Sequence, residues 1–431
     1  MQALSSKVYQ NLLECRTFAL VLITNFAILF GAVPESQSQW VQTDPAGIMS
    51  QMTVSSFAVS GTNIFAGTHD SGVFISSNNG TSWTQVNNGL PQLYVNALGV
   101  TGSSMLVGMF NYGVFRSVDN GANWVSVNDD LFGANNIETF LTVGSNLYVG
   151  TFGAGVFLST NDGVNWTKRN TGMENFPVLS LLSNGSYLFA GTLHGGIFRS
   201  STNGASWVAV NTGLPDTSNY AYSGLAVFGG NIFAGTSNFS GPAGIYRSSD
   251  NGANWTSALG NLPVDTYFPS LAVVGSNLYS GTNKGLYCTS DNGTTWHLAQ
   301  TGLTGNAIYV DAFAISGSSV FVGTEGVGVW KRPLSQLATL TSTASSMTSF
   351  SNYPNPFSDR TRIEFSSNVS GAVEVSIMNL LGQQVAQIFS GRLNAGGHSF
   401  EWNPAGIAPG MYSGVIRANG EMTRFPMMLV R

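Results

Sequence analysis

Seven tryptophans recur along the first 300 residues at nearly constant spacing. They are Trp40, Trp83, Trp124, Trp166, Trp207, Trp255 and Trp296, and successive members lie 41 to 48 residues apart. A unit of about 42 residues cannot bury its own apolar face, so neighbouring copies must pack against one another. The spacing therefore predicts a repeat architecture in which each copy forms one structural unit.

The last six tryptophans end an eight-residue pattern, Ser/Thr-x-Asp/Asn-x-Gly-x-Ser/Thr/Asn-Trp. Its third position is occupied by Asn78, Asp119, Asn161, Thr202, Asp250 and Asp291. Asp and Asn side chains accept hydrogen bonds from nearby backbone N–H groups and fix turns. Since Asn and Thr hold a turn but bind metal poorly, we interpret this position as structural and expect no metal or cofactor.

Each copy also contains four short apolar segments bounded by Gly, Asn or Ser. In one copy they are residues 95–101, 105–109, 113–117 and 124–127. Four short strands in about 42 residues match one propeller blade. The expected fold is all-β: a seven-bladed β-propeller in which the segment after Trp40 pairs with residues 328–331 and closes the ring.

The composition and the N-terminal residues limit the partners and the cellular location. Charged residues make up 9% of the chain and the net charge is −5, which disfavours nucleic acid and anionic membranes as partners. Residues 1–38 have the pattern of a signal peptide, with Lys7 and Arg16 ahead of the short apolar run 18–33. An uncleaved anchor is the alternative, but no membrane span is expected once the signal is removed. Cys15 would leave with the signal, and Cys288 is interpreted as a strand residue.

Ligand contacts are expected on the loops that join the second strand to the third. Loops on a rigid scaffold are the usual place for binding, and these converge near the centre of the propeller. They carry His69, Asp70, Tyr112, Phe152, His194, Lys284 and Glu325. The 48-residue copy adds two segments on the same face, with Tyr220, Tyr222, Asn238 and Phe239 as further candidates, although a tolerated surface insertion is the alternative.

Enzymatic activity would need a convergent set of charged residues. Three of the arginines, Arg116, Arg199 and Arg247, share one repeat position beside the eight-residue pattern, so they cannot meet around a substrate carboxylate. The catalytic candidates are Asp70 and Glu325, which lie in corresponding loops of copies that become adjacent when the ring closes.

The eight-residue pattern resembles the Asp-box, or BNR repeat, of sialidase-like propellers. The resemblance covers about residues 40–335 and rests on six copies in register. It implies that the pattern is a hairpin turn between the third and fourth strands. Because this repeat occurs in hydrolases, receptors and assembly factors, it leaves the function open.

The C-terminal residues form a separate unit. Residues 336–350 read as a Ser/Thr-rich linker, and alternating strands follow at 361–366, 372–379, 384–389, 398–402 and 410–417, which predicts a small β-sandwich. Residues 351–431 contain a set of spaced motif residues: Pro354, Asn355, Pro356, Phe357, Gly382, Gly410 and Tyr412. With these residues, the segment resembles the type A sorting domain of the type IX secretion system. The resemblance implies delivery across both membranes of a Gram-negative-type bacterium, with the type IX translocon and its sorting protease as partners.

These observations divide the chain into a signal peptide (1–38), a propeller (39–335), a linker (336–350) and a sorting domain (351–431). We expect a secreted or cell-surface propeller that binds a glycan or protein. A glycoside hydrolase acting on extracellular polysaccharide is the main alternative, and a structural part of an adhesin is a third.

Overall fold

The computed structural model describes residues 39–44, 47–102, 104–238, 243–263, 267–268, 270–337, 347–367, 370–379, 383–418 and 421–430. The expected signal peptide, 1–38, therefore lies outside the described residues, as does most of the expected linker. The two folded parts that follow are described separately.

Between residues 39 and 337 the described chain forms seven four-stranded antiparallel sheets. The first contains β2 (Val54–Ser60), β3 (Asn63–Thr68), β4 (Val73–Ser76) and β5 (Thr84–Gln85). Five more follow in chain order: β6 (Val95–Thr101), β7 (Ser104–Met109), β8 (Gly113–Ser117) and β9 (Val125–Ser126); β10 (Ile137–Val143), β11 (Asn146–Thr151), β12 (Gly155–Ser159) and β13 (Thr167–Lys168); β14 (Val178–Ser183), β15 (Leu188–Thr192), β16 (Ile197–Ser200) and β17 (Val208–Ala209); β18 (Tyr220–Phe228), β19 (Asn231–Asn238), β20 (Ile245–Ser248) and β21 (Thr256–Ser257); β22 (Ser270–Val274), β23 (Asn277–Thr282), β24 (Gly285–Thr289) and β25 (His297–Leu298).

The seventh sheet takes strands from two distant parts of the chain. β26 (Val310–Ser316), β27 (Ser319–Thr324) and β28 (Val329–Pro333) are joined by β1 (Val41–Gln42). Val41 pairs with Lys331 and Gln42 with Trp330, as expected for the segment after Trp40. Short helical turns η1 (Ile48–Gln51), η2 (Thr217–Asn219), η3 (Gly305–Ile308) and α2 (Leu334–Leu337) occupy connections.

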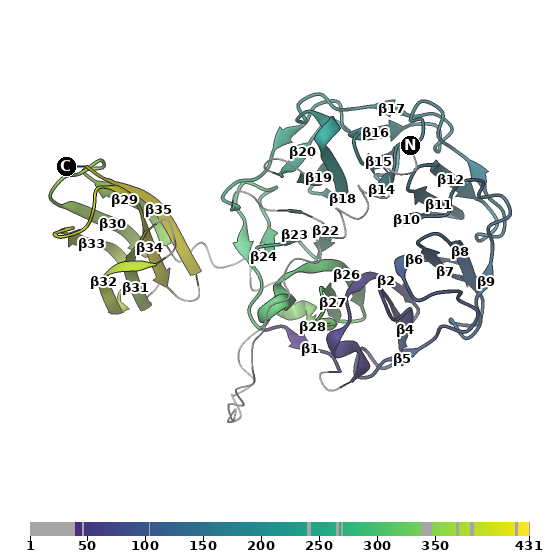
Figure 1. Cartoon of the computed structure of the whole chain (residues 1–431), viewed down its shortest axis with the longest axis horizontal. Helices are drawn as coiled ribbons and strands as arrows, with labels where there is room; N and C mark the ends of the chain where they lie inside the picture. Colours follow the sequence, from purple (N-terminus) through teal and green to yellow (C-terminus); the bar gives the residue numbers. More distant parts are fainter. Residues whose placement is uncertain are drawn as a thin grey trace. The chain divides into compact units, whose positions relative to one another are not determined.

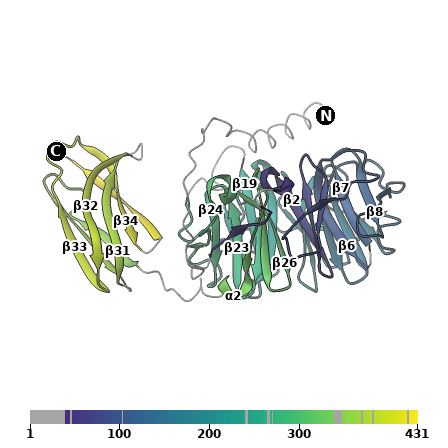
Figure 2. The same cartoon turned by 90° about the horizontal axis from the view of Figure 1, so that it is seen from below.

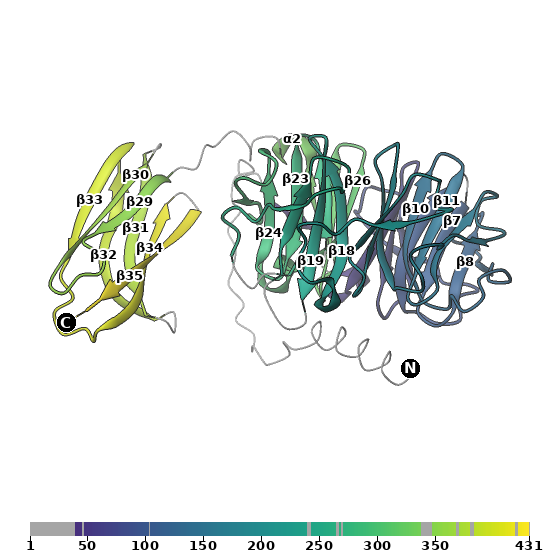
Figure 3. The ribbon, with the colours of Figure 1, turned by 90° about the horizontal axis from the view of Figure 1, so that it is seen from above.

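The sheets are arranged like propeller blades. Their first strands lie innermost, around a common centre, and β2 contacts both β6 and β26 (Figure 1). Side views show the strands of each sheet running between two faces of the domain (Figures 2 and 3). The expected all-β fold with propeller-like blades is confirmed.

Apolar side chains fill the spaces between neighbouring sheets. One cluster joins Phe65 and Val73 of the first sheet to Val107 and Trp124 of the second, and all four side chains are buried. Burying a large apolar side chain contributes about 1.5–3 kcal/mol, so these clusters hold the sheets together. The tryptophans add hydrogen bonds: the indole Nε1 of Trp124 donates to the carbonyl of Val86 in the preceding sheet at 2.8 Å.

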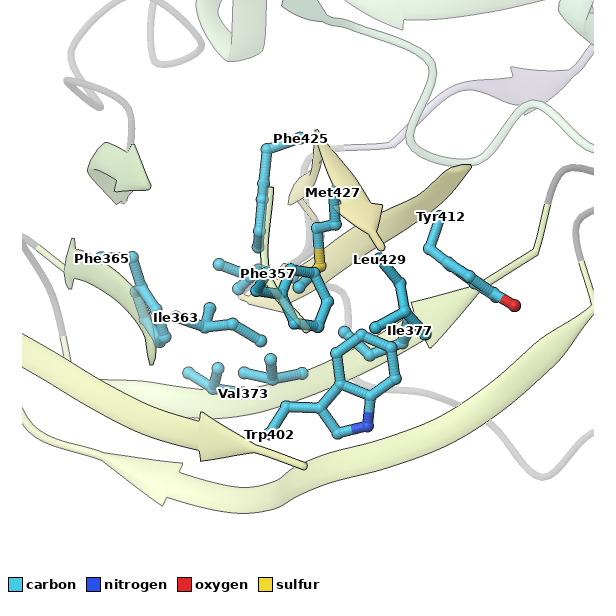
Figure 4. Packing of buried hydrophobic residues seen from close by; sticks show 12 residues of the cluster. Phe357, Ile363, Phe365, Val373, Ile377, Trp402, Tyr412, Phe425, Met427 and Leu429 are labelled. Atoms are coloured by element: carbon cyan, nitrogen blue, oxygen red, sulfur yellow. The ribbon is translucent and has the colours of Figure 1, made fainter. Parts of the chain in front are cut away.

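The C-terminal part is a small two-sheet structure. One sheet has the order β29 (Met347–Tyr353), β30 (Thr361–Ser367) and β33 (Gly396–Trp402), and the other has β32 (Gln384–Leu393), β31 (Gly371–Met378), β34 (Gly410–Ala418) and β35 (Glu421–Leu429). Its core includes Phe357, Trp402 and Tyr412 (Figure 4). β29 begins at Met347, inside the segment expected to be linker, because Phe350 and its neighbours pair with β30.

Candidate functional site

The connections of the propeller sheets lie on two opposite faces. In the first sheet, Val54 pairs with Thr68 at one end, and Ile64 pairs with Ser76 at the other. The connection from β3 to β4 is therefore at the opposite end of the sheet from the turn between β4 and β5. We call the end that carries the β3–β4 connection, with its equivalents in the other sheets, the loop face. The end that carries the β4–β5 turn, with its equivalents, is the turn face.

On the turn face, the polar groups of each eight-residue pattern satisfy one another. The Ser117 hydroxyl donates to Asp119 Oδ1 at 2.7 Å, and the N–H groups of Gly121 and Asn123 donate back to these two side chains at 2.8 and 2.9 Å. The Asn123 side chain also donates to Asp119 and is the main cause that lowers the pKa of this carboxyl to about 2.

A neutral side chain holds the same turn. In the fourth copy, Thr202 Oγ1 accepts the N–H of Ser206 at 2.9 Å, as the Asp119 carboxylate does in its own copy. A feature that sequence reasoning missed is the fourth position of the pattern, which adopts the left-handed conformation in every copy. Its φ angles lie between 51° and 59° at Asn79, Asn120, Asp162, Asn203, Asn251 and Asn292. Asn and Asp tolerate this conformation better than other non-glycine residues, which explains their use there.

Basic side chains link four of the six turns to the sheet before each of them. Arg116 Nε donates to the Asp162 carbonyl at 2.8 Å, and Arg199 and Arg247 make the equivalent bonds to Asn251 and Asn292. Lys331 Nζ donates to the Asn79 carbonyl at 3.0 Å. These cations therefore serve as links between neighbouring sheets on the turn face.

The loop face has a regular backbone. The Thr68 hydroxyl donates to the Gly72 carbonyl at 2.9 Å, and corresponding bonds recur at Thr151, Thr192, Thr236, Thr282 and Thr324. The N–H groups of His69, Phe152 and Glu325 each donate to the residue that precedes the first strand of their own sheet. These bonds hold the loops in a fixed conformation.

His69 lies in an aromatic cluster. Its ring is stacked on Tyr94, with centroids 4.7 Å apart and planes 4° apart, and Tyr94 contacts Phe110 at 6.0 Å. Tyr112, in the next loop, is 46% exposed, and Lys284 is also exposed. The sequence pointed to His69 and Tyr112, but Tyr94 and Phe110 were missed because ring contacts between copies leave no mark on the repeat pattern.

Asp70 and Glu325 lie in loops that are anchored on one residue. The His69 N–H donates to the Thr53 carbonyl at 3.2 Å, and the Gly326 N–H donates to the Thr53 hydroxyl at 3.0 Å. The Asp70 carboxylate is exposed and accepts a bond from Ser71, while Glu325 is half-buried. The structure thus joins the two loops through Thr53.

The segment inserted in the fifth sheet is fixed by its neighbour. The His194 N–H donates to the Tyr220 carbonyl at 3.0 Å, and its ring Nδ1 lies 2.6 Å from the Ser218 carbonyl. Tyr222 is fully buried and belongs to the apolar cluster that also contains Phe189 and Trp255, so its ring is part of the core. The expectation that Tyr222 contacts a ligand is corrected on this ground. Asn238 ends β19, and Phe239 lies outside the described residues.

Another missed feature is a β-bulge near the loop face in six of the first strands. In β2, the pairing shifts between Val54 and Ser56, leaving Ser55 as the extra residue. The corresponding residues in the other strands are Asn96, Glu138, Leu179, Ser223 and Asp311. Ser55 donates to the Val95 carbonyl at 2.7 Å, and Asn96 donates to the Ile137 carbonyl at 3.0 Å. Bulges re-aim side chains and are frequent beside functional sites.

In the C-terminal part, the motif residues lie along the last strand. Phe357 is buried, its N–H donates to the Met428 carbonyl, and it forms a parallel bridge with Leu429. Asn355 accepts the Met428 N–H at 2.8 Å and donates to the Pro426 carbonyl at 3.0 Å, and its neighbours Pro354 and Pro356 are exposed. Gly410 pairs with Leu429, and the Tyr412 hydroxyl donates to Ala408. Gly382 lies outside the described residues.

Two family models match the chain. One, described as DUF6242 beta propeller domain, matches residues 100–224, and the other, described as secretion system C-terminal sorting domain, matches residues 351–425. The chain contains a β-propeller domain and a C-terminal secretion sorting domain. No curated protein matches the sequence.

Solved structures share the fold at low sequence identity. The extracellular domain of a hybrid two-component system from B. thetaiotaomicron is 14% identical with a TM-score of 0.56, over 77% of this chain and 46% of that one. This chain therefore spans less than half of that neighbour. YCF48 bound to D1 peptide is 14% identical with a TM-score of 0.54, and the match covers 70% of this chain and 98% of that one. An ancestral GH74 enzyme is 16% identical with a TM-score of 0.56, and the match covers 89% of this chain and 60% of that one. At these identities the likeness concerns the fold alone.

The sorting domain determines the destination of the protein. It directs the chain to type IX secretion, and so to the cell surface or the extracellular space. Among the described helices, none has the length and apolar character needed to cross a membrane. Among all the residues that the structure describes, no group of three or more His, Cys, Asp or Glu side chains is arranged to hold a metal ion.

Proposed function

We propose that this secreted or surface protein binds an extracellular glycan or protein through the loop face of its propeller. The observation that carries the proposal is the difference between the two faces. On the turn face, the polar groups of each turn bond one another, as Ser117, Asp119 and Asn123 do. On the loop face, Tyr112 and Lys284 are exposed and His69 is half-buried, and all three lie on loops with a fixed backbone. Such groups on a rigid scaffold suit ligand binding.

The proposal includes a scaffold of seven blades closed into a ring by β1. Its support is the pairing of β1 with β28 and the contact of β2 with both β6 and β26. The eight-residue turns are proposed to be Asp-boxes of the sialidase-like type, supported by their repeated hydrogen bonds. The proposed divisions remain residues 1–38, 39–335, 336–350 and 351–431, with the start of β29 favouring a shorter linker.

Binding arrays test the proposal. The secreted protein is applied to glycan and protein arrays, and each ligand found is titrated against Tyr112→Ala and Lys284→Ala on the loop face. We expect weaker binding by at least one of these variants. The control is Asn203→Gly on the turn face, which keeps the left-handed turn and should bind as the original protein does. The proposal is wrong if no ligand is found, or if every loop-face variant binds the ligand as the original protein does.

Glycoside hydrolysis is a second candidate, favoured by the anchoring of the Asp70 and Glu325 loops on Thr53. Glycosidases of the two common types place two carboxyl groups about 5–10 Å apart. The fold likeness to a GH74 enzyme adds support at the level of the scaffold. Release of sugars from extracellular polysaccharides, measured with and without Asp70→Asn, tests this candidate; no release, or release that Asp70→Asn leaves unchanged, removes it.

A further inference from the structure

We infer that the eight-residue turns of the propeller carry five sites of spontaneous deamidation, and that the hydroxyl group at the first position of each turn keeps these sites intact in the folded protein. In five of the six turns, the fourth and fifth positions are Asn followed by Gly. We call these five Asn–Gly sequences the turn pairs, and their asparagines are Asn79, Asn120, Asn203, Asn251 and Asn292. The inference concerns the covalent chain itself and does not depend on the proposed binding function.

An asparagine followed by glycine is open to this reaction because glycine has no side chain to hinder the attacking atom. The glycine backbone nitrogen gives up its proton to a base and attacks the side-chain carbonyl carbon of the asparagine. The new C–N bond closes a succinimide ring, and the side-chain amide nitrogen takes up a proton and leaves as ammonia. Water then opens the ring at either carbonyl, so the product is aspartate or isoaspartate, with a carboxylate in place of a neutral amide.

The asparagine of each turn pair is accessible to water. Four of the five asparagines are exposed, and Asn292 is half-buried. The water that would open the succinimide ring therefore reaches this side of the pair. By sequence and exposure alone, the turn pairs would be sites of deamidation.

The glycine nitrogen, in contrast, is buried and already bonded. The Gly121 N–H donates to the Ser117 hydroxyl oxygen at 2.8 Å, and all five glycines are buried. The same bond, 2.8 to 3.1 Å long, recurs in the other turn pairs at Gly80, Gly204, Gly252 and Gly293. A buried N–H that is held in a hydrogen bond meets a base only when its segment opens. The glycine side of each pair thus blocks a reaction that the asparagine side would permit.

The first-position hydroxyl is suited to this role because its own proton is engaged elsewhere. Ser117 donates to Asp119 Oδ1 at 2.7 Å, which leaves the hydroxyl oxygen to accept the Gly121 N–H. The Ser117 side chain is buried, with 1% of the residue exposed, so water does not reach it in the closed turn. Thr289 makes the equivalent bond in the last turn, at 3.1 Å, so a threonine hydroxyl serves as well.

Peptide mapping by mass spectrometry on the full secreted chain tests the inference. The original protein, Ser117→Ala and Ser117→Thr are incubated at pH 8, and the conversion of each turn pair is followed over time, with the chain unfolded in urea as the reference. We expect all five pairs to react in the unfolded chain and to react much more slowly in the folded protein. Ser117→Ala should raise the rate at Asn120 about fivefold or more, the change expected for one lost hydrogen bond.

The other turn pairs of the same molecule are internal controls. In Ser117→Ala, the rate at Asn203 should stay as in the original protein, and Ser117→Thr should protect Asn120 as serine does. An unchanged rate at Asn120 in Ser117→Ala overturns the role of the hydroxyl, and so does a rise at every turn pair, because the whole propeller would then have opened. Turn pairs that react in the folded protein as fast as in urea, or that stay intact in urea, also overturn the inference. If Ser117→Ala does not fold, Ser200→Ala decides the matter, with the rate read at Asn203 and Asn120 as the control.

Discussion

Trp40 and Ala299 are 259 residues apart in the chain and are joined by a hydrogen bond. The indole Nε1 of Trp40 donates to the Ala299 carbonyl at 2.9 Å, and its backbone N–H donates to Thr301 at 2.8 Å. Trp255 makes the same two bonds to the sheet before it, from its indole to the Val210 carbonyl and from its backbone N–H to the Thr212 carbonyl. In both cases the two acceptors are two residues apart. Trp40, near the start of the chain, therefore makes with the sixth sheet the same contact that Trp255 of the fifth sheet makes with the fourth.

Replacing Trp40 should destabilise the whole propeller. Its side chain is 2% exposed and packs with Val274, Tyr279 and Leu303, so Trp40→Ala removes both packing and the indole hydrogen bond. We expect a loss of about 3–5 kcal/mol in the free energy of unfolding, which urea titration followed by fluorescence would measure. Val41→Ala is the matched control because Val41 is 53% exposed, and its effect should stay within about 0.5 kcal/mol. Equal effects of the two changes would contradict the role of Trp40.

The turn carboxylates should make stability depend on acid. Hydrogen bonds from the Asn123 side chain lower the pKa of Asp119 from 3.8 to about 2. A carboxyl whose folded pKa is depressed stabilises the fold above its unfolded pKa, and this contribution is lost as the pH falls from about 4 to about 2. We expect Asp119→Asn to fold at neutral pH, as the Asn161 copy does, and to lose less stability across that window. Urea titrations between pH 2 and pH 6 measure the free energy of unfolding of both proteins. If it falls by the same amount with pH in both, Asp119 contributes nothing to the acid dependence of stability.

The repeat made the scaffold predictable, because one interaction pattern occurs many times. The turn between Ser117 and Trp124 could be expected from its Asp, Gly and Trp residues. Its left-handed fourth position was not predicted, although Asn120 and its equivalents are all Asn or Asp, because the invariant glycine that follows already supplies a positive φ to the turn. The β-bulges were also missed, since an extra residue in a strand changes pairing without changing the spacing of the tryptophans.

The loop face was less predictable because its contacts join different copies. His69 and Tyr112 could be chosen from their place in the loops, but the stacking of His69 on Tyr94 depends on how two sheets meet. Tyr222 lies in an inserted segment that pattern alone places at the surface. It is buried because Ala221 forms a bridge with Leu193 of the neighbouring sheet and brings Tyr222 into the core.

Cys288 should be unreactive in the folded protein. Burial raises the pKa of its thiol to about 12, and its side chain is 1% exposed. Since the thiolate is the reactive form, we expect almost no alkylation of Cys288 by iodoacetamide at pH 8, and full alkylation in 8 M urea. Peptide mapping by mass spectrometry assigns the label to this residue. Rapid labelling of the native protein would mean that the sheet containing β24 opens.

Secretion should depend on the contact between the sorting motif and the last strand. The Asn355 side chain makes two hydrogen bonds to β35, at Pro426 and Met428, so Asn355→Ala leaves these backbone groups without that partner. We expect deletion of residues 351–431 to hold the protein in the periplasm and Asn355→Ala to reduce its delivery to the cell surface or medium. Immunoblots of cell fractions measure both effects. Ser358→Ala, an exposed neighbour of the motif, is the control and should be delivered normally. Normal delivery of the truncated chain would show that these residues are not the sorting signal.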